Sequence, residues 1–167
     1  MKMPLGTIVI LLVVGMTVSA SGRQGRSSAP SAVNACSLLT KQEAAAALGE
    51  SVKDGESGTV GRSLMPNTAA SYCEYASPTT VHKVHLNVWR SAADAAGQLK
   101  QMGQMVCGRK TKDGLSGLGE TACWYNEKHG ELQVFKGAIF LDVEMSRSGD
   151  TTEAIKTVAK QALARLP

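Results

Sequence analysis

The sequence lacks any pair of closely spaced cysteines. Its four cysteines are Cys36, Cys73, Cys107 and Cys123, and no two of them form a Cys-x-x-Cys pattern. Structural zinc sites usually draw two ligands from such a knuckle, and dithiol redox catalysis needs a vicinal pair. The cysteine spacing therefore argues against a zinc centre and against a redox enzyme.

The familiar catalytic and nucleotide-binding motifs are also missing. The glycine-rich segment 114–119 has neither Walker nor dinucleotide spacing. Ser63 lacks the second glycine of a nucleophile elbow. His82 and His85 are three residues apart in an expected strand, so their side chains point to opposite faces and cannot chelate one metal ion. We predict no catalytic residue, no metal and no cofactor.

Two acidic residues imitate a catalytic carboxylate pair. Asp142 and Glu144 lie two apart and share one face of an expected strand. No sequence feature indicates the burial that would shift their pKa values. We interpret them as neighbouring solvated acids on an open sheet face.

Residues 1–20 have the layout of a signal peptide. Lys2 supplies positive charge, residues 8–14 form an aliphatic run, and small residues over 17–20 suit cleavage after Ala20. An uncleaved anchor is the alternative, although the apolar stretch is short for a membrane span. We predict a secreted or periplasmic protein of the cell envelope, with any membrane attachment made through a retained leader.

A change of composition separates this leader from the rest of the chain. Residues 21–34 are rich in Ser, Gly, Arg, Pro and Ala, which is typical of a flexible linker. The formal net charge of +4 includes the three charges of Lys2, Arg23 and Arg26, so residues 35–167 carry about +1. A near-neutral segment without a basic stripe does not fit a nucleic-acid binder. Its length suits one folded domain.

In an oxidising compartment, an even number of cysteines predicts disulfides. Four cysteines allow three pairings, and the sequence alone does not decide among them. We favour Cys36 with Cys73 and Cys107 with Cys123, because each bond would join a helix end to a strand close in sequence. Each bond would stabilise the fold by about 3 kcal/mol in the chain-entropy model.

The hydrophobic pattern predicts an α+β domain with an antiparallel sheet of about five strands and helices packed on one face, in the order α-β-β-α-β-β-β-α. Glycines at Gly130 and Gly137 are expected in turns that need a positive φ. The segment 50–70 is expected to be a long loop, which is often functional. The expected strands are 71–76, 81–90, 119–127, 131–136 and 138–146.

Three helices are expected around this sheet. A capping box formed by Thr40 and Glu43 opens the first. Ser91 is expected to cap the second, and Asp150 or Thr151 the third, which carries a clean apolar stripe. We expect the second and third helices on the same face of the sheet.

A mixed aromatic and polar surface is the best candidate for function. If the cysteines of the first and third expected strands point inward with Tyr75 and Tyr125, the side chains that alternate with them along the strands point to the opposite face. Aromatic residues among polar ones are typical of recognition surfaces. Packing of the same rings under loops is the alternative. The predicted binding residues are Tyr72, Lys83, His85, Trp89, Trp124 and Phe140.

Several segments resemble a loose group of bacterial exported and lipoprotein-like domains of unknown function. They are Ala-Cys-Ser-Leu-Leu-Thr-Lys-Gln-Glu at 35–43, Ala-Ala-Leu-Gly at 46–49, Cys-Glu-Tyr at 73–75, Gly-Leu-Gly-Glu-Thr-Ala at 117–122 and Ala-Leu-Ala-Arg-Leu at 162–166. The resemblance implies an envelope protein and names no catalytic residue. The chain departs from the group because no cysteine directly follows the apolar run to receive a lipid.

These observations favour an exported, non-enzymatic binding or interaction domain for a protein or small ligand of the cell envelope. Its expected surface is the open sheet face together with the loop 50–70. The alternative is a cell-envelope enzyme or enzyme inhibitor with its site in that loop, using His82 or His85.

Overall fold

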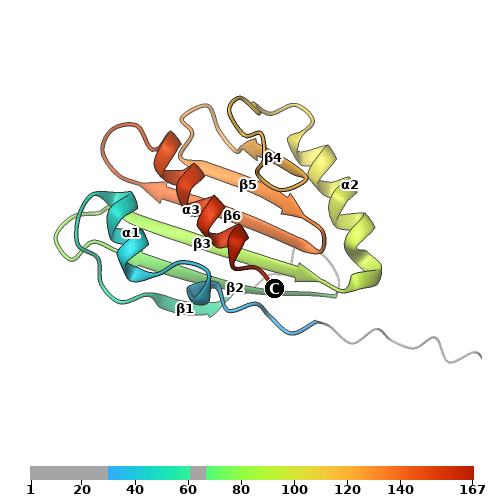
Figure 1. Cartoon of the computed structure of the whole chain (residues 1–167), viewed down its shortest axis with the longest axis horizontal. Coiled ribbons are helices and arrows are strands. Elements are labelled where there is room, and N and C mark those ends of the chain that lie inside the picture. Colours follow the sequence, from blue (N-terminus) through green and yellow to red (C-terminus); the bar gives the residue numbers. More distant parts are fainter. Residues whose placement is uncertain (1–29, 61–66) are drawn as a thin grey trace, which may run out of the picture.

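The computed structural model describes residues 30–60 and 67–167 (Figure 1). The expected leader, most of the expected linker, and Ser63 lie outside these residues. The described strands form one antiparallel sheet of six strands in the order β1-β2-β3-β6-β5-β4. They are β1 (Glu56–Thr59), β2 (Thr68–Ala76), β3 (Lys83–Ser91), β4 (Thr121–Trp124), β5 (Glu131–Lys136) and β6 (Ile139–Ser146).

Two helices and a short 3-10 turn cover one face of this sheet. These are η1 (Ala35–Ser37), α1 (Lys41–Leu48) and α3 (Thr152–Ala164), and both α-helices cross the face turned toward the viewer in Figure 1. The expected alternation in β3 is confirmed, because Val84, Leu86 and Val88 are fully buried beneath them. The apolar stripe of α3 meets the same core through Ile155 and Val158.

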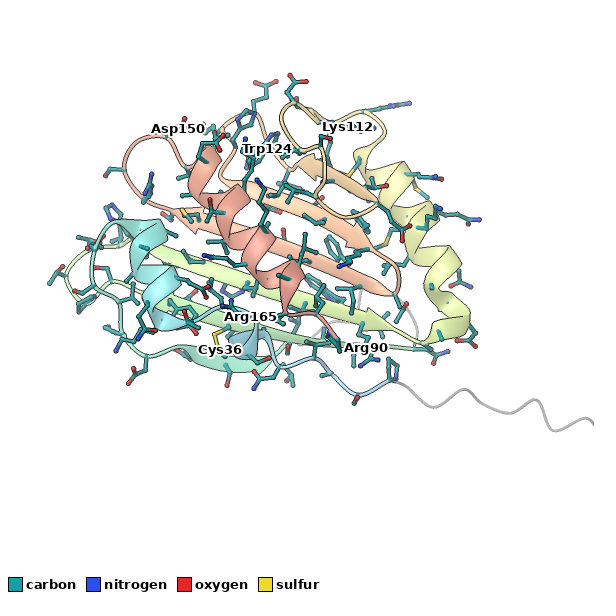
Figure 2. The ribbon with its side chains drawn as sticks, viewed as in Figure 1. Cys36, Arg90, Lys112, Trp124, Asp150 and Arg165 are labelled. Atoms are coloured by element: carbon teal, nitrogen blue, oxygen red, sulfur yellow. A yellow bond between two sulfur atoms is a disulfide. The ribbon has the colours of Figure 1, made fainter. Side chains whose placement is uncertain are left out.

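The first helix is specified locally and held by the third. Thr40 and Glu43 form the expected capping box at its start. Arg165, just after α3, donates to Leu38 O at 3.0 Å and to both carboxylate oxygens of Glu43 at 2.7 and 2.8 Å. In Figure 2, Arg165 is labelled close to Cys36, which precedes α1. The bidentate pair lowers the pKa of Glu43 to about 2.

The remaining helix, α2 (Ala96–Cys107), packs on the opposite face, so the expectation of helices on one face only is wrong. Its buried residues Leu99 and Cys107 join a second apolar core with Phe135 and Phe140. The chain neighbours of these phenylalanines, Val134 and Leu141, belong to the main core instead. Because side chains alternate along a strand, the two cores lie on opposite faces of the sheet.

Both expected disulfides are present, one on each face. Cys36 of η1 bonds Cys73 of β2 beside the main core. Cys107 at the end of α2 bonds Cys123 of β4 in the second core. Each disulfide therefore attaches a helical segment to the sheet, and the two attachments act on different cores.

The segment 50–70 is not one long loop. It contains β1, which pairs with β2 at the edge of the sheet, and β2 itself already begins at Thr68. The sequence Glu-Ser-Gly-Thr of β1 has no apolar alternation, so pairing with β2 rather than local pattern makes it a strand. Val33, at the end of the expected linker 21–34, is buried in the main core.

The expected cap of the second helix differs from the structure, and of the two residues expected to cap the third, Asp150 supplies the side-chain hydrogen bond. Ser91 is the last residue of β3, and its N–H donates to Ala138 O across to the start of β6. A 3-10 turn, η2 (Ala93–Ala95), then leads into α2 without a side-chain cap. At α3, Asp150 accepts the Thr152 N–H at 2.8 Å, whereas Thr151 donates its hydroxyl to His129 O.

The turns around β4 and β5 place their positive φ angles differently from expectation. Gly137 has φ +55° as expected, but before β5 the left-handed residue is His129, not Gly130. Gly119 has φ +63°, and a Cβ there would lie 2.6 Å from Phe135 O. A side chain at position 119 would therefore collide with the backbone of β5, so glycine is needed where the chain enters β4, which is shorter than the expected strand 119–127.

None of the helices in the described part of the chain has the length and apolar character to cross a membrane.

Candidate functional site

The sheet face opposite α1 and α3, called the open face below, is only partly covered. The strand register arranges its side chains in rows that run across β2, β3, β6 and β5. One row is acidic apart from His85, the next is polar, and the third is apolar and lies under α2. The rows are Glu74–His85–Glu144–Glu131, then Tyr72–Asn87–Asp142–Gln133, then Ala70–Trp89–Phe140–Phe135.

Stacked aromatic rings form the apolar end of the open face. The ring centroids of Trp89 and Phe140 are 4.8 Å apart, and those of Phe135 and Phe140 are 4.6 Å apart. Gly103 allows α2 to approach this stack, because a Cβ at that position would lie 2.7 Å from the Phe135 ring. The Trp89 and Phe140 rings are buried, so most of the surface of each ring packs against other residues of the protein.

A cavity of about 420 Å³ lies beside this stack, between α2 and the open face. We call it the α2 cleft. Helix α2 supplies Met102 and Val106, and the sheet supplies Phe135, Phe140 and Gln133. Lys110 and Tyr125 also line it. Most of the lining is apolar, with a few polar groups at its edge.

The polar edge of the α2 cleft is ordered by Lys110. Its ammonium group lies 4.1 Å from the centroid of the Tyr125 ring and donates to Gln133 Oε1 at 3.2 Å. Gln133 Nε2 in turn donates to Glu131 Oε1 at 3.4 Å. A continuous chain of contacts therefore joins the cleft to the carboxyl groups of the neighbouring rows.

Asp142 is not the solvated acid expected from the sequence, and it interacts with Glu131, which the sequence did not single out. Burial, followed by the negative charge of Asp142, raises the pKa of Glu131 to about 7. Burial raises the pKa of Asp142 to about 6, opposed by a hydrogen bond from Asn87 Nδ2 at 3.3 Å. Asp142 Oδ1 is buried and has no hydrogen-bond donor unless the Glu131 carboxyl carries a proton. A protonated Glu131 carboxyl would supply the donor that Asp142 Oδ1 lacks, while the neighbouring Glu144 is exposed as expected.

The other polar end of the open face is already paired. Glu74 accepts from Lys83 Nζ at 2.9 Å and lies 3.1 Å from His85 Nδ1. His85 Nε2 is 3.0 Å from Asn87 Oδ1, and the His85 ring stacks on Tyr72 at 5.3 Å. The hydrogen bond from Lys83 lowers the pKa of Glu74. This network brings together Tyr72, Lys83 and His85, three of the predicted binding residues.

The prediction for Trp124 is wrong. Its ring is fully buried in the main core, stacked on His129 with centroids 4.5 Å apart. The sequence argument assumed that Cys73 and Cys123 point to the same face. Because Cys123 bonds to α2, it points to the open face and turns Trp124 to the other. Trp89 and Phe140 do lie on the open face, but beneath α2.

The sequence analysis missed most of the α2 cleft. Met102 and Val106 are separated by one helical turn, and the outward residues of β5 alternate from Glu131 through Gln133 to Phe135. Both patterns are visible in the sequence, but Met102 and Val106 lie against the β5 residues only when α2 is placed on the open face.

A second group of polar side chains lies just before the start of β3. His82 Nδ1 is 2.5 Å from Glu50 Oε1, and His82 Nε2 is 3.2 Å from Ser148 Oγ. This order of groups matches a serine–histidine–acid chain. However, the Ser148 N–H also donates to His82 Nε2 at 3.2 Å, so the lone pair that would accept the serine proton is shared. Glu50 further accepts from Ser77 at 2.7 Å, as a loop-to-loop tie would.

In the described ranges 30–60 and 67–167, no group of three or more His, Cys, Asp or Glu side chains could hold a metal ion. No family model matches the chain, and no curated protein matches it. The case for function therefore rests on the geometry of the open face.

Proposed function

We propose that the protein is an exported, non-enzymatic binding domain that holds a small ligand against its open face, with the α2 cleft as the apolar anchor. The observation that carries this proposal is the cavity of about 420 Å³ between α2 and the aromatic stack. Small-molecule sites usually measure about 300–1,000 Å³, are mostly apolar and contain a few placed polar groups. The α2 cleft has this size and composition.

The disulfides support the exported part of the proposal. Both cysteine pairs are bonded, and the described residues contain no free cysteine. Disulfides of this kind persist mainly in secreted and periplasmic proteins. A cleaved leader over residues 1–20 would deliver the chain to such a compartment.

The polar end of the open face supports binding more than catalysis. Both imidazole nitrogens of His85 have partners, and Glu74 is neutralised by Lys83. A general base needs a free lone pair within reach of substrate. Side chains that hold one another in place present a fixed polar rim, which orients a ligand without reacting with it.

A charge placed in the α2 cleft should abolish binding there. We expect Val106→Glu to weaken binding of the neutral fluorescent probe N-phenyl-1-naphthylamine by about tenfold or more, because an ionised carboxylate loses its solvation in an apolar slot. Met105→Glu is the matched control, since Met105 is the preceding residue of α2 and is 79% exposed. Equal probe affinity in the two variants, or no saturable binding by the unmodified protein, would contradict the proposal.

The chain formed by Ser148, His82 and Glu50 favours one alternative function, a serine hydrolase of the cell envelope. A fluorophosphonate probe, which labels activated serines, separates the two functions. We expect no labelling, because the Ser148 N–H occupies the lone pair of His82 Nε2. Labelling of the unmodified protein that disappears in Ser148→Ala would establish the hydrolase instead.

A further inference from the structure

We propose that the α2 cleft selects ligands that join an apolar body to a cationic head, such as primary alkylamines or arylalkylamines. This inference rests on the proposed function and specifies its ligand class. The apolar body would lie on Phe135 and Phe140, and the cationic head would reach Glu131 and Asp142.

The carboxyl groups are close enough to the α2 cleft to be part of the same site. Gln133 lines the cleft and is the cross-strand neighbour of Asp142. Phe140 also lines it and precedes Asp142 by two residues on the same face of β6. Directly opposed residues have Cβ atoms about 5 Å apart, and residues two apart on a strand are separated by about 7 Å. A single small ligand can therefore span the ring stack and the carboxyl groups.

Three acids, Glu131, Asp142 and Glu144, lie together at this position, and Lys128 and Arg147 line a neighbouring pocket with Glu131 and Glu144. Glu131 lies directly opposite Glu144 in the register, and Asp142 is adjacent to both. Like charges in opposed positions of a sheet destabilise it. Lys110 acts on both Glu131 and Asp142, but its ammonium is already engaged by Gln133 and the Tyr125 ring. His85, opposite Glu144 on β3, is committed to Glu74 and Asn87.

One carboxylate oxygen at this position lacks a hydrogen-bond donor. Asp142 Oδ1 is buried without a hydrogen-bond partner when Glu131 is ionised. An ammonium group brings three N–H donors and one positive charge, so it satisfies Asp142 and separates it from Glu131. Burial is the first cause of the raised pKa of each carboxyl group, and the charge of the neighbouring Glu144 raises both further.

An anionic ligand fits the site less well. Lys110 would have to leave Gln133 and Tyr125 to meet an anion, and the anion would face Glu131, Asp142 and Glu144. A neutral ligand would use the apolar surface but leave the carboxyl pair as it is.

Three probes with one tail test the inference. Octylammonium, 1-octanol and octyl sulfate share an eight-carbon chain and differ in head charge. We measure their affinities for the purified, disulfide-bonded protein by calorimetry at low salt and about pH 8, where both carboxyl groups are ionised. We expect octylammonium to bind about tenfold or more tightly than octanol, and octyl sulfate to bind more weakly than octanol.

Neutral isosteres at the carboxyl pair provide the second arm. In the double variant Glu131→Gln and Asp142→Asn, octanol affinity should stay unchanged, which also shows that the variant is folded, while octylammonium should fall to the octanol level. Glu153→Gln is the control, because Glu153 is an exposed acid on α3, across the sheet. Equal affinities for the three probes would overturn cation selection and leave the binding function standing. Binding of none of them would overturn the binding function itself.

Discussion

Replacing Cys107 and Cys123 by alanine is expected to lower the free energy of unfolding by about 3 kcal/mol, because the disulfide closes a loop with a sequence separation of 16. The same change should weaken binding in the α2 cleft by about tenfold. Helix α2 forms one wall of the cleft through Met102 and Val106, and the disulfide fixes its C-terminal end to β4. Without the bond, that wall loses its anchor next to Val106.

The other disulfide supplies the matched control. Replacing Cys36 and Cys73 should cost about 4 kcal/mol, since the sequence separation is 37. That bond lies beside the main core, so cleft affinity should be unchanged under conditions where both variants are folded. Urea unfolding gives the stabilities and probe titration gives the affinities. A cleft that binds normally without Cys107 and Cys123 would show that α2 is held by packing alone.

The free energy of unfolding should decrease by about 2 kcal/mol between pH 5 and pH 8, which follows from the raised carboxyl pKa values. Glu131 has a pKa of about 7 and Asp142 of about 6, both above the ordinary values of 4.5 and 3.8 for these side chains. The folded protein therefore binds more protons than the unfolded chain above pH 5, and folding is favoured there by acid. Stability is lost as the pH rises through these values, where the two negative charges and exposed Glu144 repel each other.

Glu131→Gln should flatten this dependence and raise stability at pH 8. The glutamine can donate to Asp142 at any pH, as the protonated glutamate does in acid. Urea unfolding at several pH values checks this, with Glu153→Gln as the control on the opposite face. Lys110 and His85 also face Glu131 and Asp142, and both are present in the two proteins. The informative quantity is therefore the difference in the free energy of unfolding between Glu131→Gln and the unmodified protein. Parallel curves for the two proteins would contradict the assignment.

Features with a strong local signal were predictable from the sequence. The capping box at Thr40 fixed the start of α1, and the apolar stripe through Ile155 and Val158 identified α3. The alternation in β3 predicted its buried face. Both disulfides match the pairing that was favoured among the three possible ones, because each joins a helix end to a strand close in sequence.

Features that depend on distant pairing were not predictable in this way. The edge strand β1 has no apolar pattern, and its ladder with β2 makes it a strand. The side of the sheet taken by α2 involves contacts between residues distant in sequence, such as the close approach of Gly103 to the Phe135 ring. The placement of α2 also decides the directions in which Cys123 and Trp124 point. The assumption that Cys73 and Cys123 point to the same face therefore left the α2 cleft unpredicted and assigned Trp124 to the surface.

The most direct test of the binding proposal is methyl NMR of the protein labelled with ¹³C at its methionine methyl groups, during titration with octylammonium. Met102 lines the α2 cleft, whereas Met145 is buried in the main core on the opposite face. The proposal predicts a saturable shift of the Met102 methyl signal and a stationary Met145 signal. Bound octylammonium that leaves Met102 unshifted would contradict it.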